Sequence, residues 1–173
     1  MELISIDTIE QADFFVWHLD TIQLEEWGKS YLAKQPYLTN FFNVAETFRV
    51  NKAQQDFIFR CYLVILISYN YYGFTFPEFE REEHVKVIHI WRDYFMKGGK
   101  NPTNYRRQKI YLEESKQPLL SQYILKRFSE AKSGNQNLFS DDNPVPIMNL
   151  YILIDFLHRM VEKMEEERDK VIE

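Results

Sequence analysis

The chain has 173 residues, of which 45% are hydrophobic and 16% aromatic, and its formal net charge is −5. This length and composition exclude a disordered tail and fit one domain, residues 1–173, with a sizeable core. Because only five Gly and six Pro are present, we expect long helices and not a many-stranded sheet. The single cysteine, Cys61, excludes an internal disulfide, and residues 1–4 lack a basic, apolar leader, so we expect a reducing, cytoplasmic setting.

Three helical patterns occupy the N-terminal part of the chain. Asp7 has the position of an N-cap, and apolar residues follow it at helical spacing up to Leu19. A second pattern starts at Thr21 and is closed by Pro36, and a third lies over residues 38–50. The connections are short, so we expect neighbouring helices to form antiparallel hairpins. The residues expected to form the buried stripe of the first helix are Ile9, Ala12, Phe14, Phe15, Val16, Trp17 and Leu19.

Residues 57–72 form the most apolar stretch of the chain and predict a central helix. Asn51 and Gln54 have the spacing of a capping box before it, and Gly73 supplies a C′ residue after it. The segment between these signals, about residues 52–72, is too long for an ordinary strand and makes about six helical turns. Because apolar side chains point in every direction around this helix, other helices have to surround it.

Polar residues within the central stretch argue against a membrane span. Arg60 and Asn70 cut the apolar run below the ~20 residues that a span needs, so we expect no membrane-spanning segment. Cys61 has apolar neighbours, and burial among them would raise the pKa of its thiol. The stretch is therefore interpreted as a core helix whose thiol is unreactive.

Two charged segments follow the central helix. Pro77 has the position of a first-turn helix residue, and residues 98–99, both Gly, end the pattern that it opens. The basic segment over residues 97–117 combines a loop with a weak pattern, for which a short surface helix from Tyr105 to Lys116 is one interpretation. The residues expected to be buried on the helix after Pro77 are Val85, Ile88, Trp91 and Phe95.

The C-terminal part predicts two further helices. Pro118 begins the first, and residues 133–145 after it form a polar stretch long enough for a mobile loop. An Asn-Pro pair precedes the last helix, in which apolar residues recur every seven positions from Leu150, a spacing that suits pairing with another helix. The charged second half of this helix is expected to project into solvent. Altogether the sequence predicts an all-α, single-domain bundle of six or seven helices around the central helix over residues 52–72.

Polar side chains on two predicted helices form a candidate metal site. Glu80 and His84 are i,i+4 neighbours, and Asp155 with His158 has a D-x-x-H spacing at which both side chains reach one metal ion. Such residues in an inter-helix cavity would suit a metal-dependent enzyme, but di-metal bundles repeat a Glu-x-x-His pair that this chain lacks. We favour the alternative, a helix-edge Glu–His pair together with a buried Arg60 that is satisfied by a carboxylate.

Residues 97–132 carry nine Lys or Arg against three Glu, a local charge of +6, so the rest of the chain carries −11. Such segregation suits phosphate binding, and tyrosines between the cations can stack on exposed bases. The alternative, which we favour because the whole chain is acidic, is a solvated face that meets acidic helices of the same chain or an acidic partner. The candidate nucleic-acid residues are Lys100, Tyr105, Arg106, Arg107, Lys109, Lys126 and Arg127, and Tyr111 lies between them in the sequence.

No catalytic motif accompanies these residues: Gly-rich phosphate loops, C-x-x-C metal spacing and a G-x-S-x-G elbow are absent from the sequence. The leading prediction is therefore a non-catalytic helical interaction protein, without a cofactor, that binds a partner protein or a second copy of itself through helix–helix contacts. Nucleic-acid association through residues 97–132 is the second prediction. A metal-dependent enzyme using the four candidate metal ligands is the third.

Overall fold

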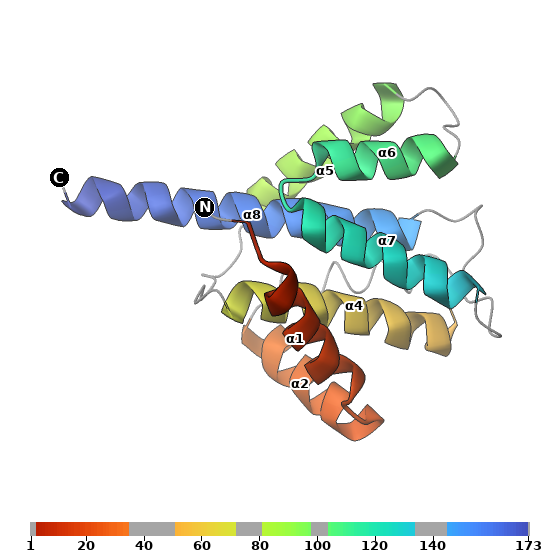
Figure 1. Ribbon diagram of the computed structural model, residues 1–173. Coiled ribbons are helices and arrows are strands. Elements are labelled where there is room, and N and C mark those ends of the chain that lie inside the picture. Colours follow the sequence, from red (N-terminus) through yellow and green to blue (C-terminus); the bar gives the residue numbers. More distant parts are fainter. Residues whose placement is uncertain (1–2, 35–50, 72–80, 98–103, 134–144, 173) are drawn as a thin grey trace.

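The computed structural model describes seven helices and, in the segments that it describes, no strand (Figure 1). These segments are residues 3–34, 51–71, 81–97, 104–133 and 145–172. The predicted all-α bundle around a central helix is confirmed. The predictions that concern Pro77, Gly73, residues 98–99, the pattern over 38–50 and the loop after residue 133 lie outside the described residues. The helices are α1 (Ile6–Trp17), α2 (Thr21–Lys34), α4 (Lys52–Tyr71), α5 (Arg81–Lys97), α6 (Asn104–Glu114), α7 (Pro118–Ser133) and α8 (Val145–Ile172).

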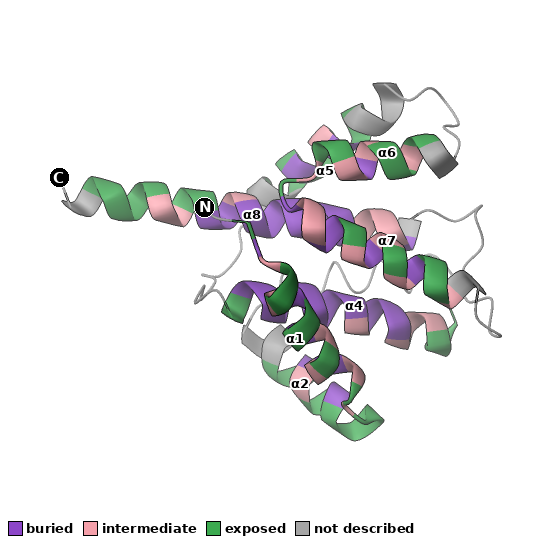
Figure 2. Ribbon diagram, viewed as in Figure 1, coloured by how far each residue is buried: buried purple, intermediate pink, exposed green. Residues whose placement is uncertain are grey.

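Helix α4 begins where the sequence predicts. The Gln54 N–H donates to Asn51 Oδ1 over 3.0 Å, and the Asn51 N–H donates to Gln54 Oε1 over 2.7 Å, which forms the expected capping box. From Phe57 to Tyr69 every side chain is buried except that of Arg60, which is half-buried (Figure 2). Over this length the helix has no solvent face, and its packing depends on the helices around it.

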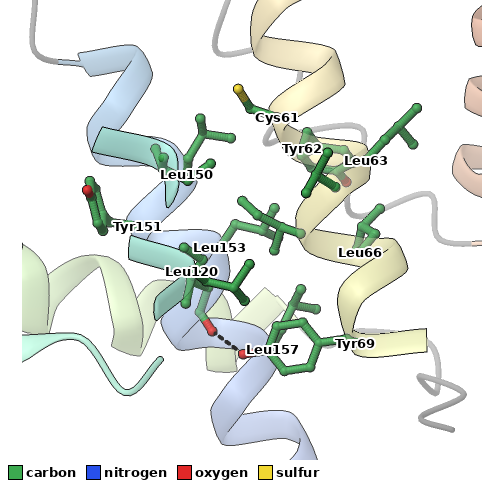
Figure 3. Close-up of a cluster of buried hydrophobic side chains, with 14 of the residues drawn as sticks. Cys61, Tyr62, Leu63, Leu66, Tyr69, Leu120, Leu150, Tyr151, Leu153 and Leu157 are labelled. Atoms are coloured by element: carbon green, nitrogen blue, oxygen red, sulfur yellow. Dashed lines mark hydrogen bonds between the residues drawn. The ribbon is translucent and has the colours of Figure 1, made fainter. Parts of the chain in front are cut away.

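Helices α1 and α8 both pack on α4 (Figure 1). In Figure 3, Tyr69 points from α4 toward Leu157 of α8, and Leu153 lies between the two helices. The Tyr69 hydroxyl donates to the Ile154 carbonyl over 3.0 Å, which satisfies a polar group whose pKa burial raises well above its usual value. Cys61 is fully buried, and burial raises its pKa as predicted. None of the described helices is apolar enough over sufficient length to cross a membrane.

Helix α8 is the second apolar element of the bundle. Its side chains from Leu150 to His158 are all buried, and α4, α5 and α7 pack against it. Beyond Val161 most of its residues are exposed, and this half of the helix extends past the other helices (Figures 1 and 2). The helix is therefore half core and half solvated, as its sequence predicts.

An aromatic cluster joins α5, α6 and α8. The rings of Tyr111 and Tyr151 stack with centroids 4.2 Å apart, and the Trp91 centroid lies 6.0 Å from each of them. All three side chains are buried. The weakly patterned segment after residue 104 thus forms a helix that is anchored to the core through Tyr111, because a stacked, buried aromatic ring contributes both area and a specific geometry.

The predicted N-cap of the first helix is wrong. Ser5 caps α1, and its Oγ accepts a hydrogen bond from the Thr8 N–H over 3.2 Å. Asp7 lies in the first turn instead, where its carboxylate interacts favourably with the positive end of the helix dipole. With Ser5 as N-cap, Ile4 and Ile9 take the N′ and N4 positions of a hydrophobic staple, and both are fully buried. Burial of this pair favours Ser5 over Asp7.

The predicted buried face of α5 is partly wrong. Trp91 is buried as expected, and its buried i−4 neighbour is Val87, whereas Val85 and Ile88 are 40% and 39% exposed. The apolar residues of this helix occupy more than one face, so their spacing alone did not identify the line that meets the core. The Phe95 side chain lies outside the described residues.

The close approach of α2 to α4 predicts whether the substitution Gly28→Ala stabilises or destabilises the protein. A Cβ at Gly28 would lie 2.5 Å from Cζ of the buried Phe59 ring. Helix propensity alone would make Gly28→Ala stabilising by about 1 kcal/mol. We expect it to destabilise by about 1–3 kcal/mol in urea unfolding, because the ring has to move within a packed core.

The control is the same substitution in a Phe59→Leu background, where the shorter side chain leaves room for the new methyl group. There Gly28→Ala should be neutral or stabilising. A stabilising effect with Phe59 in place would contradict the packing described between α2 and α4.

Candidate interaction surface

The outer face of α1 exposes large apolar side chains. Phe14 is 67% exposed and Ile6 is 49% exposed, although both lie on a regular helix. Nearby in the chain Leu3 and Ile22 are also exposed, as is Tyr71 at the end of α4. Single exposed apolar residues are ordinary, but several on one side of a helix can mark a binding site.

The prediction that Phe14 belongs to the buried stripe is wrong. The buried side of α1 follows Ile9, Ala12 and Val16, and the helix packs on α4. At about 100° per residue, Phe14 lies on the opposite side from Ala12. Phe14 shares its outward face with His18, one turn later, and the centroids of the two rings lie 4.0 Å apart. The polar i+4 neighbour was the sequence signal that Phe14 faces outward.

Two grooves flank Phe14. The first has a volume of about 820 Å³ and lies between α1, the first turn of α2 and Tyr71 of α4. The second has a volume of about 540 Å³ and lies between α1 and α7. Phe14 lines both grooves and forms the ridge between them. We name this region the α1 surface, and it is defined by Ile6, Asp7, Glu10, Phe14, His18 and Tyr71.

Arg60 holds the C-terminal end of α1 against α4. Its guanidinium donates to the Val16 carbonyl over 2.6 Å and to the Leu19 carbonyl over 3.1 Å, and it lies 5.5 Å from the centroid of the Trp17 ring. The prediction that a carboxylate satisfies Arg60 is therefore wrong. The last carbonyls of a helix have no partner within it and carry the negative end of its dipole, so a cation satisfies them well.

Arg127 of α7 holds the other side of α1. Its guanidinium pairs with the Asp13 carboxylate and lies 4.8 Å from the centroid of the Trp17 ring. The Tyr123 hydroxyl donates to the same carboxylate, and burial raises the pKa of Tyr123. These partly buried, charge-assisted contacts fix the wall between α1 and α7, so the second groove is bounded by an ordered network.

The candidate metal ligands are not brought together among the described residues. Asp155 and His158 are both buried on α8, but no group of three His, Cys, Asp or Glu in the described part of the chain is placed to hold a metal ion. The Arg159 Nε donates to Asp155 Oδ2 over 3.3 Å. Glu80 and the side chain of His84 lie outside the described residues.

His158 takes part in a buried hydrogen-bond network that links the N-terminal segment, α7 and α8. The Ile4 N–H donates to Gln117 Oε1 over 2.9 Å, so the amide nitrogen of Gln117 faces His158 Nδ1 at 3.1 Å and donates to it. His158 Nε2 then carries the proton and lies 3.2 Å from Glu162 Oε1. This arrangement requires a neutral imidazole, because a proton on Nδ1 would point at the amide protons of Gln117.

Some of the candidate nucleic-acid residues are exposed, and others are buried or paired with carboxylates of the same chain. Lys109 lies 3.5 Å from Glu113 and Lys126 lies 4.0 Å from Glu130, each on its own helix. Tyr111 is buried and offers no face on which a base can stack. Arg106 is exposed, Arg107 is half-buried and Arg127 pairs with Asp13, while Lys100 and the side chain of Tyr105 lie outside the described residues.

Comparison with known proteins adds no assignment to these residues. The chain matches no protein-family model, no curated protein and no solved structure. Function is therefore inferred from the chain's own surface, and within the described segments the α1 surface combines exposed apolar side chains with adjoining grooves.

The buried His158 predicts how stability depends on pH. Its pKa is lowered from 6.5, chiefly by burial and also by Lys116, although Glu162 and Asp155 oppose this. The unfolded chain then binds the proton more readily than the folded one. Well above pH 6.5 the His158 imidazole is neutral in both states and has no effect on stability. As the pH falls from 6.5 toward the lower pKa of the folded state, the unfolded chain takes up the proton first, and the free energy of unfolding decreases.

We expect the free energy of unfolding in urea to fall between about pH 7.5 and about pH 5.5, and to fall less in His158→Asn, which retains an acceptor for Gln117. His89→Asn, at an exposed position, should keep the wild-type pH dependence. Equal pH dependence in the wild-type protein and His158→Asn would show that the network tolerates a charged imidazole.

Proposed function

We propose that the protein is a non-catalytic interaction protein whose α1 surface binds a helix of a partner protein. The observation that carries this proposal is the 67% exposure of Phe14 on a regular helix between two grooves. Large aromatic side chains are enriched among the residues that contribute most to binding at protein interfaces. A ridge with grooves on both sides suits a helix that lays its apolar face across it.

The fixed position of α1 supports the same proposal. Arg60 holds its C-terminal end and Arg127 holds its side, both through charged hydrogen bonds that are partly buried. A surface that is already ordered loses little conformational freedom when a partner binds, so more of the contact energy appears as affinity.

The other two candidate functions have less support from the described residues. Lys109 and Lys126 lie beside carboxylates of their own helices, which reduces the charge available to a phosphate. Asp155 Oδ2 accepts a hydrogen bond from the half-buried Arg159 and His158 accepts one from Gln117, while Asp155 Oδ1 has no hydrogen-bond partner among the described residues. An interaction role would explain exposed apolar side chains that do not contribute to the core, and Phe14 is the most exposed of these on α1.

Site-specific photo-cross-linking tests the proposal. A photoreactive amino acid replaces Phe14 in cells, and in a matched control it replaces Lys109, which is exposed on α6 away from α1. We expect one discrete cross-linked product from position 14 and none from position 109, because only the first position lies in the interface. Mass spectrometry of the product identifies the cross-linked peptide and distinguishes a partner protein from a second copy.

The same product from both positions, or no product from position 14, would contradict the proposal. Sedimentation of the purified chain over a range of concentrations separates the two occupants: self-association gives a concentration-dependent mass, and a foreign partner leaves the purified chain monomeric.

A further inference from the structure

The α1 surface is acidic, and its carboxylates face outward. The first 28 residues contain seven Asp or Glu and no Lys or Arg. Among the described residues, the cations close to α1 lie on its α4 and α7 sides. Arg60 binds carbonyls at its C-terminal end, Arg127 binds Asp13, and Lys126 lines the second groove together with Arg127. Asp7 and Glu10 are exposed on the outer face, and among the described residues no cation pairs with either of them.

From this surface we infer that the occupant is a cationic amphipathic helix, with an apolar stripe that covers Phe14 and Lys or Arg residues that meet Asp7 and Glu10. The inference rests on the proposed function and adds the chemistry of the partner. Complementary charge steers such a helix to the surface and disfavours neutral or acidic helices, while the apolar contact with Phe14 supplies most of the affinity.

The order of residues along α1 also sets the pattern of the partner. Asp7 and Glu10 lie in the N-terminal half of the helix, and Phe14 and His18 follow at its C-terminal end. At 1.5 Å per residue, the carboxylates precede Phe14 by about 6–10 Å along the axis. The basic residues of the partner should therefore lie about four and seven positions from its main apolar anchor, on one face of a helix of about three turns.

Anionic partners do not suit this surface. Asp7 and Glu10 line the first groove, and no Lys or Arg is among its described lining residues. On and beside α2, the exposed carboxylates of Asp20, Glu25 and Glu26 outnumber the exposed cation of Lys29. A phosphate backbone, an acidic peptide or an anionic lipid headgroup would be repelled there. The charge thus selects a cationic helix among the occupants that the first groove admits.

Two synthetic helical peptides test the inference on the full chain. They have the same length and the same Leu and Trp stripe, and one has Lys where the other has Glu. We expect the Lys peptide to bind in fluorescence anisotropy at low ionic strength, with amide chemical-shift changes concentrated on α1, and the Glu peptide not to bind. Phe14→Ala should weaken binding about tenfold, and Asp7→Asn with Glu10→Gln should weaken it about fivefold.

A matched pair of variants separates a specific contact from net charge. Glu166→Gln with Glu167→Gln makes the same change in net charge on the projecting half of α8 and should leave the affinity unchanged. Equal binding of both peptides, or equal losses in the two double variants, would overturn the cationic assignment. Cross-linking at position 14 to a partner segment without basic residues would also overturn it, but would leave the proposed function standing. Loss of both the cross-link and the dependence on Phe14 would remove the proposed function itself.

Discussion

The fold depends on one constraint: helix α4 has no side that tolerates water. Its side chains from Phe57 to Tyr69 are buried around the full circumference, apart from the half-buried Arg60. Each fully buried large apolar side chain is worth roughly 1.5–3 kcal/mol, so leaving any face uncovered would cost a large part of the stability of a domain of this size. The packing of α1 and α8 on α4 follows from that requirement. The positions of α5, α6 and α7 follow in turn from the need to cover α8.

The sequence predicted the features that strong local signals specify. The capping box at Asn51, the apolar run of α4, the start of α7 at Pro118 and the solvated end of α8 are all as expected. The errors arose where two local signals competed. The predicted N-cap, Asp7, lies two residues after Ser5, which caps α1 in the structure, and the burial of the Ile4 and Ile9 side chains, a tertiary effect, favours Ser5. A helix with apolar residues on several faces does not reveal which face is covered, and that ambiguity misplaced Phe14, Val85 and Ile88.

The candidate sites were harder to predict because a buried polar residue can form structural hydrogen bonds with other elements instead of binding a ligand. Arg60 looked like a core cation in need of a carboxylate, yet its partners are backbone carbonyls at the end of a helix far away in the sequence. His158 looked like a metal ligand, and it forms a hydrogen-bond network that holds the first residues of the chain to α7 and α8. Sequence spacing identifies neighbours within one helix, but these partners come from other elements. The α1 surface was missed for the same reason, since its exposure depends on which side of α1 faces α4.

The most direct test of the enclosed central helix is native-state amide hydrogen exchange, resolved by residue and compared with the free energy of unfolding in urea. If other helices surround α4, its amides from Phe57 to Tyr69 should exchange only through global unfolding, with free energies that match the urea value. Amides of the projecting half of α8, from Glu162 to Lys170, should exchange far faster. Exchange of the α4 amides through local opening, several kcal/mol below the global value, would contradict the account.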